Sequence, residues 1–238
     1  MSVFANLVGQ LADLLQPLFG VSAAAAAIVL FTALVRLLVH PLSRAAARGQ
    51  KARVALQPRI AELRRKHARN PEKLQRAVLE LHTAEKVSPL SGCLPSMLQL
   101  PAFFLLYHLF SSATIGGRAN ELLGHRLFDA PLGGRWADAL GDGGVFGGAG
   151  LVYIALFAVV TVVAWFSYRL SRRMTAAQAP TAGADGGQQV PGLATMTKVM
   201  PFMSFFTLVT VAVMPLAAAL YVVTSTTWSV VERSVLYR

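Results

Sequence analysis

Hydrophobic positions along the chain gather in four long blocks instead of interrupted stripes. The blocks run from Val21 to Val39, from Leu94 to Ser112, from Ala149 to Tyr168 and from Val199 to Val231. As a helix rising about 1.5 Å per residue, the first block is about 28 Å long, enough to cross a hydrocarbon core of about 30 Å. The pattern predicts an all-α membrane protein.

The last block is too long for one ordinary span, and Met214-Pro215 lies near its middle. Proline ends or kinks a helix because it lacks the backbone N–H donor. We therefore predict a membrane hairpin of two short helices, each of about 15 to 17 residues, at or below the lower limit for crossing a bilayer. A single kinked and tilted helix is the alternative.

Counting this hairpin as two spans predicts five transmembrane helices. In chain order the predicted segments are an extracytoplasmic amphipathic helix (1–20), span 1 (21–42), a basic cytoplasmic helical hairpin (43–88), span 2 (89–112), an extracytoplasmic loop with one short helix (113–148), span 3 (149–168), a cytoplasmic linker (169–195), span 4 (196–213), span 5 (214–232) and a short cytoplasmic tail (233–238).

The N-terminal segment has apolar residues at three- and four-residue spacing from Phe4 to Leu18. This spacing predicts a helix that lies on the outer membrane face, or alternatively one that packs against the bundle. No Lys or Arg precedes Gly20, so the segment lacks the basic start of a secretory signal, and we expect no cleavage.

Composition and charge agree with a membrane protein. Hydrophobic residues make up 55% of the 238 residues and charged residues 14%, against roughly 25% charged in soluble proteins. The net charge of +11 would suit nucleic acid, but twelve of the 22 Lys and Arg residues lie between Arg44 and Lys86. Such clustering marks a cytoplasmic segment, so we expect the N-terminus outside, the C-terminus inside and no binding of DNA. Cys93 is the single cysteine, which excludes an intramolecular disulfide.

The basic segment has the pattern of an antiparallel helical hairpin. Asn70 can cap a helix, Pro71 suits its first position and Glu72 complements its dipole. Residues 45–67 also have helical composition, with Pro58 as the expected kink.

Twelve basic and four acidic residues give the hairpin a net charge of +8. This charge suits anionic lipid, ribosomal RNA or a targeting factor, and the alternative is a solvated face that only sets topology. The candidate recruitment residues are Arg53, Arg59, Arg64, Arg65, Lys66, Lys73 and Arg76.

Arg36 interrupts the first apolar block. A charge at the centre of a span costs on the order of 2.5 to 3.5 kcal/mol, and the other apolar blocks contain no Asp or Glu to neutralise it. Two interpretations remain. The guanidinium either snorkels to the inner interface near Leu42, about 9 Å away along the helix, or it faces a water-filled cavity that attracts polar parts of a polypeptide.

Several polar residues of the other spans are candidates for lining such a cavity. Many Thr and Ser hydroxyls in spans bond back to their own helix, so only some of these residues are expected to line it. The candidates are Gln99, Thr161, Thr207, Thr224 and Thr227, with Thr210, Ser225 and Thr226 as further polar positions.

The stretch Pro89-Leu-Ser-Gly-Cys-Leu-Pro-Ser-Met-Leu-Gln-Leu-Pro-Ala-Phe103, followed by Tyr107, closely resembles the start of the second core span in the YidC/Oxa/Alb family of membrane protein insertases. The similarity extends to Asn70 through Gln75, to Met200-Pro-Phe202 and to the segment from Pro215 to Tyr221. Arg36 falls at the position of the family's groove arginine.

This resemblance implies five spans around a hydrophilic groove that is open to the cytoplasm and to lipid. It also implies an insertase that is not an enzyme, with no cofactor and no metal. Its partners would be nascent membrane proteins and the lipid bilayer, with the ribosome, a targeting factor or its receptor, and the Sec translocon as further candidates. The basic hairpin would recruit substrates.

The chain departs from the family pattern in the last span. Leu216 to Ala219 and Val222 stand where a glycine and then a tryptophan are common, and the Ser225-Thr226 region replaces an asparagine. We also find no large extracytoplasmic domain and no basic tail before Arg238. These features favour a bacterial plasma membrane over an organelle.

Three other functions were compared with the sequence. A solute transporter or channel would also use an intramembrane arginine, but it predicts internal repeats and acidic coupling residues, which we do not find. A membrane enzyme predicts a metal-binding or nucleophile motif, and none occurs. A non-inserting assembly factor needs no motif and stays open.

Overall fold

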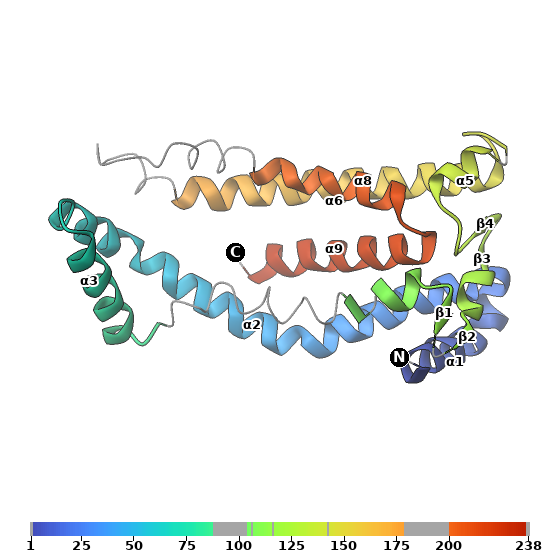
Figure 1. Cartoon of the computed structure of the whole chain (residues 1–238), viewed down its shortest axis with the longest axis horizontal. Helices are drawn as coiled ribbons and strands as arrows, with labels where there is room; N and C mark the ends of the chain where they lie inside the picture. Colours follow the sequence, from blue (N-terminus) through green and yellow to red (C-terminus); the bar gives the residue numbers. More distant parts are fainter. Residues whose placement is uncertain are drawn as a thin grey trace.

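Long helices lying side by side form most of the described chain. A small cap (residues 114–141), which contains two β-hairpins, covers one end (Figure 1). The computed structural model describes residues 2–87, 104–178 except 106, 116 and 142, and 200–236. Gln99, the start of predicted span 2 and most of the predicted linker lie outside the described residues.

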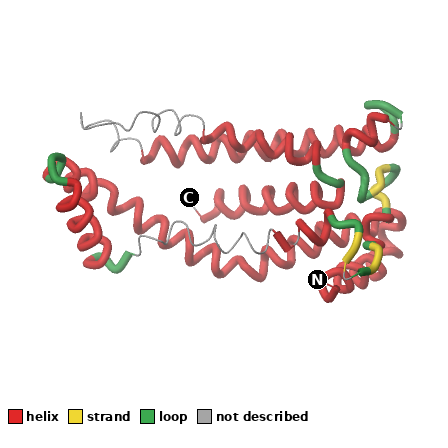
Figure 2. Tube along the Cα trace, in the orientation of Figure 1, coloured by secondary structure: helices red, strands yellow, loops and turns green. Residues whose placement is uncertain are grey.

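The elements follow one another in a mainly helical order (Figure 2). They are α1 (Ser2–Phe19), η1 (Gly20–Ser22), α2 (Ala23–Lys66), α3 (Pro71–Ala84), β1 (Thr114–Ile115), β2 (Arg118–Ala119), η3 (Glu121–Gly124), β3 (Arg126–Leu127), β4 (Ala130–Pro131), α5 (Trp136–Gly141), α6 (Gly148–Gln178), η5 (Met200–Phe205), α8 (Phe206–Val213) and α9 (Leu216–Leu236). Residues 107–111 are also helical.

α1 folds back on the first turns of α2. Gly20 ends α1 because its φ of +52° is a left-handed conformation that glycine adopts without strain. On the inner face of α1, Val8 and Ala12 are buried in one core with Ala24 of α2. Leu18 on the other face is exposed. The packing interpretation therefore holds for one face of the helix, while the other face is apolar and exposed.

α2 is one helix of 44 residues, so predicted span 1 and the first arm of the predicted hairpin are continuous. Pro41 and Pro58 both lie within it. α3 folds back at the end of α2 that lies away from the cap (Figure 1). The predicted start of α3 is confirmed, because the Lys73 N–H donates to the Asn70 side chain over 3.0 Å and Pro71 is the first helical residue.

Among the described residues, two helical stretches are long and apolar enough to cross a membrane by length and composition. One lies within Val3–Lys66, which contains both α1 and α2, and the other is Gly148–Arg173, while Phe202–Val213 is a shorter apolar helix. The described structure therefore agrees with an all-α membrane protein at this coarser level.

α8 and α9 are separate helices that run antiparallel and meet at Met214 and Pro215, next to the cap (Figure 1). The alternative of one kinked helix is therefore wrong. α9 lies between α2 on one side and α6 with α8 on the other. The helices α2, α6 and α8 therefore all have α9 as a neighbour.

The cap contains more regular structure than the predicted loop. β1 pairs with β2 and β3 pairs with β4, each as an antiparallel pair of two-residue strands. Strands this short show no alternation in the sequence, which is why the pattern did not predict them. Trp136 of α5 anchors the cap on α6, with ring centroids 5.7 Å from Tyr153 and 5.3 Å from Phe157.

Backbone carbonyls of the cap bind the first turn of α9. The Leu216 N–H donates to Gly134 O and the Ala217 N–H to Leu132 O, both over 2.9 Å. The Tyr153 hydroxyl donates to the same Gly134 carbonyl over 2.6 Å. These bonds satisfy backbone donors that a helix start leaves free.

Three alanines near the start of α9 are packed completely. Ala217, Ala218 and Ala219 are each 0% exposed. Small side chains let the cap and the neighbouring helices approach α9 closely, so these alanines have a packing role.

We predict that Ala218→Leu destabilises the protein because a larger side chain overfills a packed core, at a cost of about 1–3 kcal/mol. Each kcal/mol lowers the unfolding temperature by roughly 2–4 °C for a chain of this size, measured on the purified protein in detergent. Ala155→Leu on the exposed side of α6 is the matched control, expected to leave the temperature unchanged. Equal shifts for both variants would contradict the packing argument.

Candidate functional site: the polar seam between α2 and α9

Arg36 points from α2 to the buried face of α9. Its Nε donates to the Ser225 hydroxyl over 3.1 Å, and its Nη2 donates to the same oxygen. The Arg36 side chain is half-buried and Ser225 is buried. Arg36 lies thirteen residues, about 20 Å, along α2 from Ala23, so the charge is deep in the predicted span.

A second polar contact lies on the same seam. His40 is one turn after Arg36 on α2, and its Nδ1 lies 2.6 Å from Glu232 Oε1 of α9. Residues four apart share a helix face, as do residues seven apart, so both contacts join the same two faces. We name these four residues, Arg36, His40, Ser225 and Glu232, the α2–α9 polar seam.

The seam gives Arg36 a neutral acceptor and places an acid nearby. Ser225 carries no charge, so its hydroxyl satisfies two donors of the guanidinium without neutralising it. Tyr221, one turn earlier on α9, also hydrogen-bonds to Ser225. The Glu232 carboxylate interacts with Arg36 electrostatically while it contacts His40 directly. A positive charge therefore remains available in a partly buried position.

The threonines predicted to line a cavity bond mainly to their own helices. Thr161 donates to Phe157 O, Thr224 to Leu220 O and Thr227 to Val223 O, over 2.7 to 2.8 Å. Thr161 is exposed on α6.

Thr207 lies in a different place from Arg36. It lines a small gap between α6, α8 and α9 together with Val160, Ala164 and Thr226. Arg36, in contrast, faces the seam between α2 and α9. The described residues therefore do not bring Thr207 and Arg36 together.

The predicted recruitment residues all lie on α2 and α3, and six of the seven are exposed. Arg59 forms an ion pair with Glu85, which ties α2 to the end of α3. Arg53 is half-buried, and the exposed residues are Arg59, Arg64, Arg65, Lys66, Lys73 and Arg76.

The described part of the chain contains no cluster of side chains that could hold a metal ion. No group of three or more His, Cys, Asp or Glu side chains lies together among those residues.

A comparison of the sequence with models of known protein families agrees with the helical architecture described above. The sequence model of the family described as "60Kd inner membrane protein" matches residues 14–238. The chain belongs to this family. The match confirms the resemblance to the YidC/Oxa/Alb insertases and, with the long apolar helices, shows a membrane protein.

Relatives within the 60Kd inner membrane protein family are named "Membrane protein insertase YidC". The chain is 42% identical over 98 residues to the protein of Clostridium perfringens, which covers 41% of each chain. It is 40% identical over 86 residues to that of Chlorobium limicola, covering 36% of this chain and 15% of the relative. The match to an Anaeromyxobacter protein is 43% over 81 residues, 34% of this chain and 15% of the relative. The matched region is thus less than half the length of these relatives.

Three members of the seam were missing from the predicted site. The sequence predicts Ser225 only as a further polar position. Glu232 follows the last apolar block by one residue, and a search for acids confined to the blocks passes over it. His40 lies one helical turn from Arg36, which is the signal that sequence reasoning could have used.

We predict that Ser225→Ala lowers the free energy of unfolding by about 1.5 kcal/mol, the lower end for a hydrogen bond to a charged group, because Arg36 loses its acceptor. Thermal unfolding in detergent measures the change. Ser229→Ala is the matched control, since the Ser229 hydroxyl bonds only its own helix carbonyl at Ser225 among the described contacts. Similar losses in both variants would show that the contact between helices contributes nothing.

Proposed function

We propose that this chain is a membrane protein insertase that brings a polar end of a nascent protein partway into the bilayer through a cytoplasm-open groove containing Arg36. Moving polar groups into hydrocarbon costs several kcal/mol per unsatisfied group. A protein that offers water and a hydrogen-bonding cation partway across lowers that cost without covalent chemistry. The observation that carries the proposal is the half-buried Arg36, held by the neutral Ser225 hydroxyl.

Exchange of the hydrogen-bond acceptor is the proposed mechanism. A carboxylate on the incoming segment replaces Ser225 at the Arg36 guanidinium, because charge-assisted hydrogen bonds are roughly twice as strong as neutral ones. Ser225 recovers the guanidinium when the carboxylate leaves. The neutral acceptor thus keeps the site closed and ordered without holding the cation too tightly for exchange.

The proposal includes five spans, with the cap outside and the C-terminus in the cytoplasm. Its support is the distribution of charge: the basic arms of α2 and α3 lie at the end of the bundle opposite the cap (Figure 1), as the positive-inside rule requires. α8 and η5 together contain 14 residues. At about 1.5 and 2.0 Å per residue they extend roughly 24 Å, so we expect local thinning of the bilayer beside them.

Recruitment is the proposed role of the basic α2 and α3 arms. Exposed Arg64, Arg65 and Lys66 end α2, and Lys73 and Arg76 begin α3, so a cationic tip extends from the bundle. Such a tip attracts anionic lipid or ribosomal RNA. The proposed partners are nascent membrane proteins and the bilayer, with the ribosome, a targeting factor or its receptor, and the Sec translocon in addition.

We predict that Arg36→Ala reduces insertion of single-span substrates with acidic translocated tails about tenfold, equivalent to roughly 1.5 kcal/mol, and of neutral-tail substrates much less. Ser225→Asp should give the same selectivity, because the new carboxylate pairs with Arg36 and competes with the substrate. Insertion is measured by protease protection of ribosome-bound substrates in proteoliposomes.

Arg44→Ala is the matched control for this experiment, since it removes the same charge from an exposed position two turns further along α2. It should leave the ratio of acidic-tail to neutral-tail insertion unchanged. If Arg36→Ala and Arg44→Ala affect both substrate classes equally, attraction by Arg36 is not the mechanism.

We also predict the orientation by cysteine labelling in a Cys93→Ser background. Phe128→Cys in the cap, where Phe128 is 70% exposed, should react with a membrane-impermeant maleimide on intact cells. Arg69→Cys between α2 and α3 should react only after the membrane is opened. The reverse pattern would place the cap in the cytoplasm and remove the cytoplasm-open groove.

A further inference from the structure

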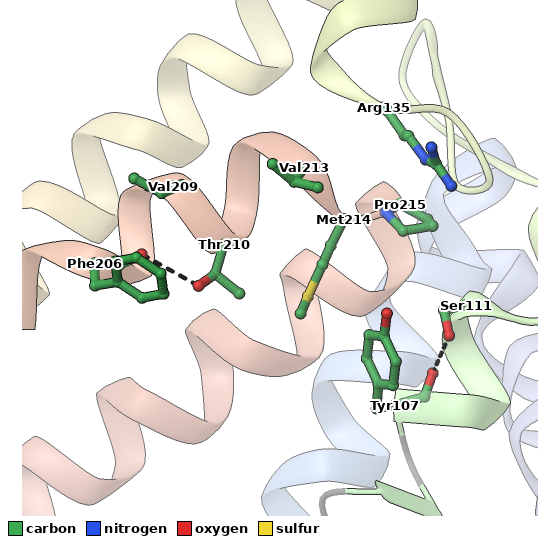
Figure 3. A pocket seen from close by; sticks show the side chains of 9 residues that line it. All are labelled: Tyr107, Ser111, Arg135, Phe206, Val209, Thr210, Val213, Met214 and Pro215. Atoms are coloured by element: carbon green, nitrogen blue, oxygen red, sulfur yellow. Dashed lines mark hydrogen bonds between the residues drawn. The ribbon is translucent and has the colours of Figure 1, made fainter.

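A pocket of about 530 Å³ lies where α1, η1 and the cap meet, and we name it the α1–cap pocket. Its volume is in the range of small-molecule sites, about 300–1,000 Å³. Buried Ala23 and Ala24, in the first turn of α2, also line it. This pocket is distinct from the one between α8 and the helix of residues 107–111, where Arg135 is the one charged residue among the described lining residues (Figure 3).

The α1–cap pocket combines polar groups of opposite charge from two parts of the chain. Asp13 and Gln16 are three residues apart on α1, so they share one helix face. The cap contributes His125 and Arg126, the first residue of β3. All four residues are exposed. The pocket therefore brings a carboxylate and an amide together with a guanidinium and an imidazole.

The two charges of the pocket are not paired with each other. The ion pairs found among the described residues lie elsewhere, one between α2 and α9 and one between α2 and the end of α3. Within that part of the chain, neither the Asp13 carboxylate nor the Arg126 guanidinium has an ion-pair partner. Both charges are therefore free to bind the two ends of a ligand that itself carries both signs.

Backbone hydrogen bonds hold the cap side of the pocket in place. The Leu132 N–H donates to His125 O over 2.9 Å, and β3 pairs with β4. The Phe128 N–H donates to the Ser22 hydroxyl of η1 over 3.3 Å, which ties β3 to the start of α2. The positions of the two charges are thus set by ordered segments that are joined to each other.

Large apolar side chains are exposed next to these polar groups. Val21 lines the pocket and is exposed, Leu18 precedes it by three residues, and Phe128 follows Arg126 by two. Ala23 begins the apolar run of α2, so the pocket lies at one end of a predicted span, where hydrocarbon meets the headgroup layer. A soluble zwitterion would leave these apolar side chains in water, whereas a phospholipid contacts both the polar and the apolar groups.

We propose that the α1–cap pocket binds the headgroup of a zwitterionic phospholipid with a primary ammonium, such as phosphatidylethanolamine. Arg126 binds the phosphate, because its fork of N–H donors matches two phosphate oxygens. Asp13 and Gln16 accept hydrogen bonds from the ammonium, and the acyl chains lie beside Val21 and Phe128. The site does not depend on the insertase proposal, because it needs only that the chain lies in a bilayer.

The lining residues favour this headgroup over the two common alternatives. A choline headgroup has no N–H donors, and proteins bind quaternary ammonium groups with aromatic cages. The described residues that line the pocket include no Phe, Tyr or Trp. A phosphatidylglycerol headgroup has a phosphate for Arg126 but no cation for Asp13. Phosphatidylethanolamine alone among these three lipids matches both charges with hydrogen-bonding groups.

Photolabelling of the full chain in phosphatidylcholine vesicles tests this site. The vesicles contain a trace of phosphatidylethanolamine, phosphatidylglycerol or phosphatidylcholine with a diazirine in one acyl chain, and mass spectrometry maps the labelling of Val21 and Phe128. We expect about threefold more labelling from phosphatidylethanolamine than from either other lipid, within the range that an exposed ion pair supplies. Asp13→Asn should reduce the ratio to phosphatidylglycerol to about one, and Arg126→Gln should reduce labelling by both lipids.

Glu121→Gln and Arg135→Gln are the matched controls, since they remove the same charges from exposed positions of the cap that do not line the pocket. Both should keep the threefold ratio. Equal labelling by phosphatidylethanolamine and phosphatidylglycerol in the wild type, or a ratio that Asp13→Asn leaves unchanged, would overturn the proposal. Crosslinks from a ribosome-bound substrate to Val21 and Phe128, with loss of the lipid labelling, would assign the pocket to polypeptide and overturn it as well.

Discussion

The start of α9 faces a constraint that organises the rest of the structure: a helix that begins inside a bundle must find acceptors for its free N–H groups. Pro215 breaks the apolar hairpin and creates this helix start. The cap meets the need through the carbonyls of Leu132 and Gly134, and Tyr153 of α6 holds Gly134 from the other side. One set of hydrogen bonds thereby joins the cap, α6 and α9.

The need for hydrogen-bond partners inside the bundle also explains where its hydroxyl groups donate. Four hydroxyl side chains of α9 each donate a hydrogen bond to a carbonyl of the preceding turn: Thr224, Thr226, Thr227 and Ser229. Their hydroxyl protons are therefore not available to acceptors on other helices. Arg36 is different, because a guanidinium has five donors and no backbone carbonyl of its own helix to use. It reaches across to Ser225, so the contact between α2 and α9 contains a charged group.

Sequence patterns predicted the features that depend on local chemistry. The cap of α3 by Asn70 and the break at Pro215 follow from the properties of single residues, and the apolar blocks follow from hydropathy. The partner of Arg36 depends instead on which face of α9 meets α2, which a single chain without contacts does not reveal. The two-residue strands of the cap are likewise held by pairing between segments and by α6. No local periodicity in the sequence therefore predicts them.

The side chains on the two sides of α9, facing α2 and facing α6 with α8, decide where the proposed groove can open. On the side of α6 and α8, α9 presents Val223 and Thr226 beside Val160, Ala164 and Thr207, and the Thr226 hydroxyl already donates to Val222 O. Separating these residues would expose mainly apolar packing and no charged partner. On the α2 side, Arg36 and His40 can exchange Ser225 and Glu232 for water or for a substrate carboxylate at little net cost, because each polar group keeps a partner. We therefore propose that a groove for a polar chain would open along α2, because α9 packs on α6 and is hydrogen-bonded at its start to the cap.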